Sequence, residues 1–417
     1  MNPAVLSDAS RTLTSSPLWA SAFRPFYFLG ALYAPLLIAA WLGAFLGLWN
    51  LPSGQLLKLQ HGHEFIFGFS AAIITGIVLT ALPSWAGTEE IAGRRLGLLV
   101  ALWLAGRIAF WAAPWLPALL PGIVDCLLFP AVFVMLAPQL LRAANRLYLL
   151  LLPILFALFA ANLAYHLGLL AANDAQAWTA LRLAVYAIIV LYVLKGGVLA
   201  PIFTGNALRE KGRGDAAPFS MPLDIAAVAA LLLLAVLDLA AAPPAWTGGA
   251  ALACALLHGW RCARWKGWRV ADVPLVLVMH LGFAWLVLAF ALKAAAELTG
   301  IVPEAAWLHA FTVGSLGLMM LGLMTRVSLR HTGRPLVVPP AMLVAYALMF
   351  VAALLRLAAT VHALGNGVIA LAAALWAAAF ALYFVVFCKT LLAPSAPRSQ
   401  LFDTPSRPIP SPPRPSP

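Results

Sequence analysis

The sequence predicts an all-α membrane protein, a polytopic bundle of about twelve transmembrane helices with both termini in the cytoplasm. Three observations predict this class. The chain is 64% apolar and only 10% charged, its apolar runs recur at close to the ~20 residues that cross a bilayer, and positive charge alternates between the ends of these runs. Spanning segments must satisfy their own backbone hydrogen bonds, and without the polar alternation of barrel strands these runs are expected to be helices.

The spans follow one another with short connections, so no separate water-soluble domain is expected. The twelve candidate spans are residues 26–48, 61–83, 96–113, 119–138, 147–170, 180–203, 222–241, 246–260, 274–293, 304–325, 339–361 and 367–392. Residues 1–22 form a polar arm and residues 23–393 the transmembrane domain. The tail, residues 394–417, contains nine prolines and is predicted to be disordered.

The positive residues that give the net charge of +12 are distributed as in the loops of a membrane protein, and this argues against nucleic-acid binding. Twenty of the 26 lysine and arginine residues lie at alternate ends of the spans, and cytoplasmic loops carry such an excess. The six exceptions are Lys58, Arg107, Arg182, Lys195, Lys293 and Arg356. With an even number of spans, both termini are therefore expected in the cytoplasm, and no removable signal peptide is predicted.

The second span opens with the stretch HGHEFIFGF, which places His61, His63 and Glu64 at a membrane boundary. Residues two apart on an α-helix point about 200° away from each other, so the two histidines are candidates for two different centres. On a regular helix Glu64 shares its face with His61, whereas His63 shares one with Phe67. Small residues recur every fourth position after Glu64, which predicts that this stripe packs against another helix. The stripe consists of Glu64, Gly68, Ala72 and Gly76.

Five of the eight histidines are predicted to lie at the outer side of the membrane. They are His61, His63, His166, His309 and His362. Histidine is the commonest metal ligand, and polar groups inside a membrane are costly and tend to be functional. We expect His63 and His309 to serve one centre, with His61 or His166 contributing to a copper site. His280 lies toward the cytoplasmic side, as a candidate haem ligand or proton carrier.

Several residues have more ordinary interpretations. Boundary histidines such as His258 and His362 are expected to be interfacial, and His166 lies one turn after Asn162, with which it can form hydrogen bonds. The methionines of the tenth span are expected to be packing residues. The four cysteines form no CxxC pair, and neither an HExxH zinc motif nor a CxxCH haem motif is present, so any haem is expected to be non-covalent.

Two cations lie inside spans and need partners. Arg107 has a depth compatible with Glu64 or with a cofactor propionate, although snorkelling to the interface is the alternative. Lys195 lies in the inner half of the sixth span. The acids inside or at the edges of spans are few: Glu64, Asp125, Asp238, Glu297 and Glu304.

The chain resembles the NnrS family of bacterial membrane proteins along nearly its whole length. The most specific matching stretches are those that contain HGHE and HTGRPL. The matching stretches are SAFRPFYFLGALYAP, HGHEFIFGFSAAIITGIVLTALPSWAG, LWLAGR, GGVLAPIFTGNALR, PLVLVMHLGFAW and HAFTVGSLGLMMLGLMTRVSLRHTGRPL. One departure is visible, because Val198 follows Gly196 and Gly197 where the family usually has arginine; Lys195 keeps a cation nearby.

The resemblance implies a twelve-span protein of the bacterial inner membrane that contains haem, non-covalent and b-type, and copper. It links the chain to nitric oxide, nitrosative stress and denitrification. It also implies functional importance for a set of residues without saying which histidine binds which metal. This set is His61, His63, Glu64, His280, His309 and His331.

Two functions remain open from the sequence. The first is a metal-dependent oxidoreductase or binding protein for nitric oxide, with Glu64 relaying a proton beside the metal, Arg107 supporting it, and a membrane quinol as electron donor, although no quinol motif is present. The second is a transporter of a metal, haem or small anion, which twelve spans and buried charges also suit. A sensor is a weaker interpretation, because no soluble output domain is present.

Overall fold

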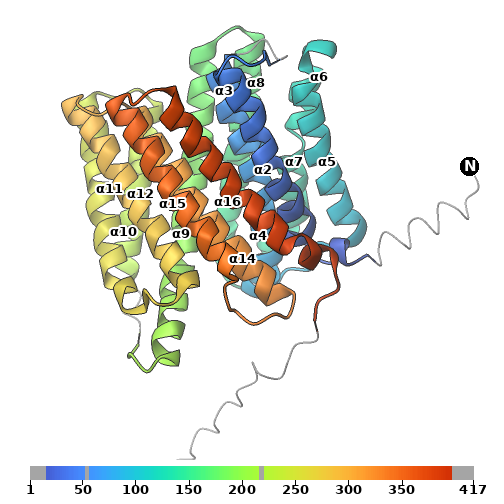
Figure 1. The fold of residues 1–417 in the computed structure, drawn as a ribbon, viewed down its shortest axis with the longest axis vertical. Helices are drawn as coiled ribbons and strands as arrows, with labels where there is room; N and C mark the ends of the chain where they lie inside the picture. Colours follow the sequence, from blue (N-terminus) through green and yellow to red (C-terminus); the bar gives the residue numbers. More distant parts are fainter. Residues whose placement is uncertain (1–15, 52–55, 216–219, 397–417) are drawn as a thin grey trace, which may run out of the picture.

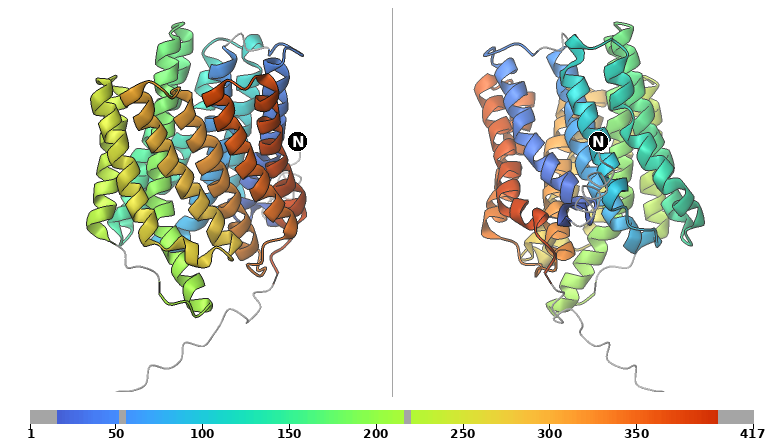
Figure 2. Two further views of the ribbon diagram at one scale, coloured as in Figure 1. Left: turned by 60° about the vertical axis from the view of Figure 1, so that its left-hand side comes forward. Right: turned by 90° about the vertical axis from the view of Figure 1, so that its right-hand side faces the viewer.

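The computed structural model describes residues 16–51, 56–215 and 220–396, and all regular structure in these residues is helical (Figures 1 and 2). Most of the predicted arm and tail, residues 1–15 and 397–417, lies outside the described residues. The first half contains α2 (Phe23–Phe45), α3 (Leu57–His63), η2 (Glu64–Ser70), α4 (Ala71–Ala86), α5 (Gly93–Trp111), α6 (Leu120–Asp125), α7 (Leu128–Arg142), α8 (Leu151–Leu170) and α9 (Asp174–Glu210). The second half contains α10 (Met221–Leu239), α11 (Pro244–Arg264), α12 (Pro274–Thr299), α13 (Ala305–His309), η6 (Ala310–Leu316), α14 (Gly317–His331), α15 (Pro340–His362) and α16 (Asn366–Leu392). Short 3₁₀ turns are η1 (Pro17–Trp19), η3 (Ala113–Trp115), η4 (Arg146–Leu150) and η5 (Gly267–Val270).

Each predicted span coincides with a helix or with helical segments that follow one another directly. Ten of these, among the described residues, are long and apolar enough to cross a membrane. The two that do not qualify are α5, which carries Arg94, Arg95 and Arg107, and α11, which carries Arg261 and Arg264. The chain is therefore a multi-pass helical membrane protein.

The helices that carry the HGHE stretch and His309 form the interior of the bundle. In the segment Leu57–Ala86, 83% of the most apolar 18-residue stretch is buried inside the protein, and in Ala305–His331 the share is 72%. In α10 the corresponding share is only 22%. Figure 1 shows α10, α11 and α12 at one side, α5, α6 and α7 at the other, and the long α9 between them.

Both interior helices contain a π-helical segment at the same place relative to a histidine. The segment η2 begins directly after His63, and η6 begins directly after His309. A π-helix has a wider turn than an α-helix, occurs rarely, and is frequent at functional sites. The two segments pack against different neighbours as well, since η2 contacts α2 and η6 contacts α12 and α15.

The two described ends of the chain meet at one end of the bundle (Figure 2). The buried guanidinium of Arg24 in α2 donates to the carbonyls of Leu391 at 2.8 Å and Ala393 at 2.6 Å, and to the hydroxyl of Ser395 at 2.8 Å. The last carbonyls of a helix have no intrahelical partner, so Arg24 satisfies these groups of α16. An even number of crossings follows from this meeting of the ends.

A buried ionic network joins α9, α10 and α12 at the opposite end. Lys293 is fully buried, and its Nζ lies 2.6 Å from Asp238 and 2.7 Å from Glu297. Tyr186 donates to the second oxygen of Asp238 at 3.0 Å. Lys293 is one of the six cations that do not follow the alternating charge pattern. It is paired with Asp238 and Glu297, two of the acids that the sequence placed inside or at the edges of spans.

We predict that Arg24→Gln destabilises the protein by about 2 kcal/mol, because hydrogen bonds from a buried charged donor are lost. Thermal unfolding of detergent-solubilised protein, followed by tryptophan fluorescence, measures the change. The control is Arg95→Gln, whose side chain is 65% exposed and should leave stability within about 0.5 kcal/mol. Equal melting temperatures for Arg24→Gln and the wild type would contradict this role.

Candidate metal centre

Three side chains from three helices meet around one point in the interior. His63 ends α3, Asp125 ends α6, and His166 lies near the end of α8. The Nε2 atom of His63 lies 3.0 Å from Oδ2 of Asp125, and the Nε2 atom of His166 lies 2.9 Å from the same oxygen. All three residues are buried, and their donor atoms lie within 4.8 Å of one another.

This arrangement has the donor types and spacing of a transition-metal site. Two ligands that each lie about 2.1 Å from one ion are separated by roughly 3–3.5 Å. Imidazole and carboxylate together suit zinc, copper, iron or manganese. The Oδ1 atom of Asn162 lies 2.9 Å from Nε2 of His63, and its Nδ2 lies 3.1 Å from Asp125. The fit rests on this donor set, and the same atoms also satisfy one another by hydrogen bonds.

Arg107 supplies the positive charge that the two buried carboxylates need. Its guanidinium donates one hydrogen bond to Glu64 and another to Asp125. Arg107 is 6% exposed and Glu64 is 0% exposed, so neither charge is solvated by water. Of the alternatives that the sequence left open for Arg107, the structure shows pairing with Glu64, and it adds Asp125 as a second partner.

Glu64 faces His63 and not His61, which corrects the expectation from a regular helix. Its Oε1 lies 3.1 Å from Nδ1 of His63, while its other oxygen accepts from Tyr33. The Glu64 backbone itself keeps α-helical dihedral angles, and the wider turn of η2 follows it. The ring of His63 lies 5.0 Å from that of Phe67, as predicted. A carboxylate on the second nitrogen of a metal-binding imidazole is a recurrent arrangement that orients the ring.

An open pocket leads from one end of the bundle to His166. Its volume is about 500 Å³, within the range of small-molecule pockets. Most of its lining residues are apolar, but polar atoms, including those of Asp174 and His166, make up nearly half of its surface. The lining residues are Leu56, Phe110, Ala113, Ala118, Pro121, Gly122, His166, Leu169, Leu170 and Asp174. Gly122 permits the close approach of α6, because a Cβ there would lie 3.0 Å from Cβ of His166.

His61 belongs to a second group on the other side of α3. Its ring lies 4.6 Å from Trp41 and 4.5 Å from Phe65. His61 and His309 lie in the same neighbourhood as Arg356 of α15, within the range of charge–charge interaction, and no direct contact between the two imidazoles is among the described interactions. The structure thus brings His63 and His166 together, with ring centroids 5.2 Å apart. It places His61 and His309 in one neighbourhood on the other side of α3.

The remaining histidines lie outside both groups. His280 is bonded to the hydroxyl of Thr204 at 2.8 Å, and His331 lies with its ring 5.8 Å from Phe23. His362 is exposed at the end of α15, as expected for an interfacial residue. His258 is instead fully buried and stacks on Phe290 at 5.3 Å, so the interfacial expectation for it was wrong.

Sequence reasoning did not assign several residues of the centre. Asp125 was visible as one of few intramembrane acids, and Asn162 as the residue one turn before His166. Their positions along the chain do not show that Asp125 and Asn162 contact each other in the folded protein. Tyr33 carries no sequence signal, because a tyrosine near a membrane boundary is common.

Fold and site together define a class: a multi-pass helical membrane protein with a buried imidazole–carboxylate group able to hold a metal. The family model described as NnrS protein matches residues 17–395. Because this match covers nearly the whole chain, the protein belongs to the NnrS family. No curated protein matches the sequence.

We predict that Gly68→Ala destabilises the protein by about 1–3 kcal/mol, because a Cβ at this position crowds the carboxylate network. It would lie 2.9 Å from the ring of Tyr33 and 3.0 Å from Oε2 of Glu64. The matched control is Gly97→Ala in α5, where no neighbour lies within 4 Å. That helix position should gain stability from alanine, so thermal unfolding that shifts both variants equally would contradict the packing argument.

Proposed function

We propose that the protein is a metal-containing inner-membrane protein of the nitric oxide response, which binds nitric oxide or performs redox chemistry on it. The observation that carries the proposal is that α3 presents His63 and His61 to two separate groups of potential ligands. Family membership supports the link to nitric oxide. The pocket that opens beside His166 at one end of the bundle supports access for a small ligand.

For copper, the proposed ligands are His63, His166 and Asp125. Copper accepts imidazole nitrogen and carboxylate oxygen, and the three donor atoms already converge. When bound, the metal supplies a redox-active site that a small neutral ligand can reach. Asn162 is within reach of the same point and orients both His63 and Asp125.

The residues around these ligands have separate tasks. Glu64 accepts a hydrogen bond from Nδ1 of His63, which directs Nε2 toward Asp125. Arg107 balances the charge of both carboxylates, and Tyr33 donates to Glu64 while accepting from Trp111 at 2.8 Å. Glu64 therefore lies where a proton can pass between Tyr33 and His63.

For haem, His61 and His309 are the proposed residues that would hold the iron, and Arg356 would pair with a propionate. The Nδ1 atom of His309 donates to the carbonyl of Ala305 at 2.7 Å, which leaves Nε2 as the free ligand atom. The Nδ1 atom of His61 is buried without a hydrogen-bond partner. Two imidazoles, one guanidinium and the aromatic rings of Trp41 and Phe65 are the kinds of side chain that contact a b-type haem.

The structure offers no support for the other elements of the sequence-based mechanism. No described contact identifies a quinol site, and His280 and His331 are not part of the one metal-capable group found among the described residues. The transporter remains the alternative. A correctly folded protein that retains neither iron nor copper through purification would favour the transporter over the metal-containing protein.

We predict that the purified protein retains copper and that His63→Ala or His166→Ala lowers copper affinity at least tenfold. Elemental analysis by mass spectrometry, after dialysis against a weak chelator, measures retention. The control is His362→Ala, which alters an exposed histidine outside the group. Copper retained equally by all four proteins would overturn the assignment.

A second prediction separates the two groups. His61→Ala and His309→Ala should each remove or shift the Soret band in the visible spectrum, because each removes one imidazole that would hold the haem iron. His63→Ala should leave that band in place while copper is lost. A Soret band that disappears with His63→Ala and persists with His309→Ala would show that the pairing is wrong.

A further inference from the structure

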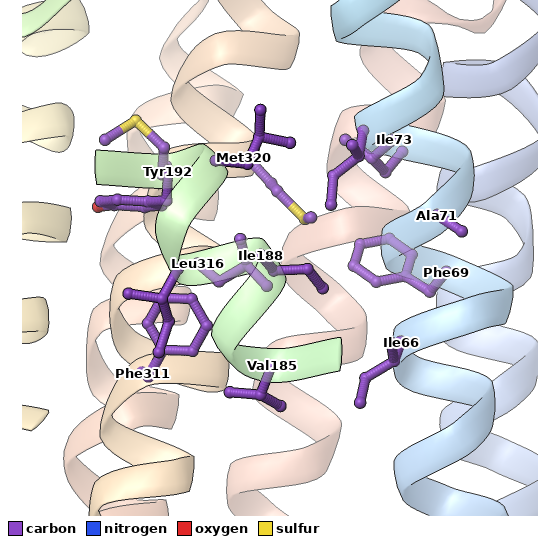
Figure 3. Close-up of a cluster of buried hydrophobic side chains, with 14 of the residues drawn as sticks. Ile66, Phe69, Ala71, Ile73, Val185, Ile188, Tyr192, Phe311, Leu316 and Met320 are labelled. Carbon is purple, nitrogen blue, oxygen red and sulfur yellow. The ribbon is translucent and has the colours of Figure 1, made fainter. Parts of the chain in front are cut away.

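A small cavity lies between the two π-helical segments, in the middle of the bundle. Its volume is about 30 Å³. It is lined by residues from η2, α9, η6, α14 and α16. They are Phe65, Ile66, Phe69, Ser70, Val185, Ile188, Phe311, Thr312, Leu316, Gly317, Met320 and Trp376. Figure 3 shows Ile66 and Phe69 facing Val185, Ile188 and Met320 across this region.

The π-helical segments give the cavity its walls from two sides. Four lining residues belong to η2 and three belong to η6. Interiors of proteins normally pack without voids, and a wide helical turn is a local departure from good backbone geometry. Because two π-helical segments line the same cavity, the cavity itself is a candidate functional feature.

The cavity is suited to an apolar occupant and poorly suited to water. A buried water needs about two to four polar partners. Only Ser70 and Thr312 among the lining residues carry a hydroxyl group, and Thr312 donates its own to the carbonyl of Leu308 at 2.7 Å. An apolar cavity of this kind stays dry and takes up apolar atoms such as xenon.

One end of the cavity lies beside the His61–His309 pair. Ten of the lining residues are buried, and only Phe65 and Thr312 are half-buried. Phe65 follows His61 by one turn, with ring centroids 4.5 Å apart. Thr312 follows His309 by three residues. The less buried end therefore lies next to both proposed haem ligands.

We infer that this cavity is a binding site for one small, neutral, apolar gas molecule, of the class to which diatomic gases belong. A cavity needs about 10–15 Å³ measured in this way to hold one water molecule, so about 30 Å³ admits a molecule of a few heavy atoms. A molecule held here is one turn away from the His61–His309 pair. This inference rests on the proposed function only for the role of the gas, and not for its binding.

Xenon tests the inference without any metal chemistry. Crystals of the full-length protein, as purified, are pressurised with xenon, and anomalous diffraction locates bound atoms. We expect one xenon among Phe69, Ile188, Phe311 and Met320, and at least tenfold lower occupancy in Val185→Phe, which fills the cavity. The matched control is Val236→Phe on α10, where the side chain is 64% exposed.

A second variant keeps the test decisive if Val185→Phe does not fold. Phe311→Leu removes part of the cavity wall and should raise xenon occupancy at the same pressure. Absence of xenon between η2 and η6 in the wild type, or equal occupancy in wild type and Phe311→Leu, would overturn the inference. A protein without copper and haem overturns the proposed function instead, since xenon binding does not depend on either.

Discussion

The pairing of Arg107 with Glu64 and Asp125 is the interaction on which the centre depends. Two carboxylates in a membrane interior repel each other, and removing the one cation between them costs about 3–5 kcal/mol. Arg107 joins α5 to η2 and α6 and holds both carboxylates in place. His63 and His166 then take their orientation from these carboxylates. The positions of the His63 and His166 rings therefore depend on Arg107, which holds the two carboxylates that contact them.

The second organising feature is the change of helical geometry directly after His63 and after His309. On one side of α3, the π-helical segment starts at Glu64, whose carboxylate contacts His63. In the middle of the bundle, the two π-helical segments leave a small apolar space where close packing would be expected. The π-helical segment η2 thus contains Glu64 of the polar centre and four residues that line the apolar cavity.

Much of the fold follows from composition because the bilayer is a demanding solvent. Backbone groups must be satisfied within helices, and apolar length must match the membrane, so every predicted span coincides with a helix. The small-residue stripe after Glu64 was predicted to face another helix, and a Cβ at Gly68 or Gly76 would indeed contact Tyr33 or Tyr27 of α2. For Arg107 the sequence left Glu64, a propionate and snorkelling open, and the structure shows the pairing with Glu64 together with an unanticipated one to Asp125.

The sequence by itself determined the helices, their order and the divergence of His61 and His63, since these depend on local periodicity and on the cost of exposing polar groups to lipid. Only the tertiary structure decided that His63 meets Asp125 and His166 while His61 lies in the neighbourhood of His309. Such meetings depend on the rotation and depth of helices that are up to about 250 residues apart. Packing sets those quantities, and spacing along one helix does not contain them.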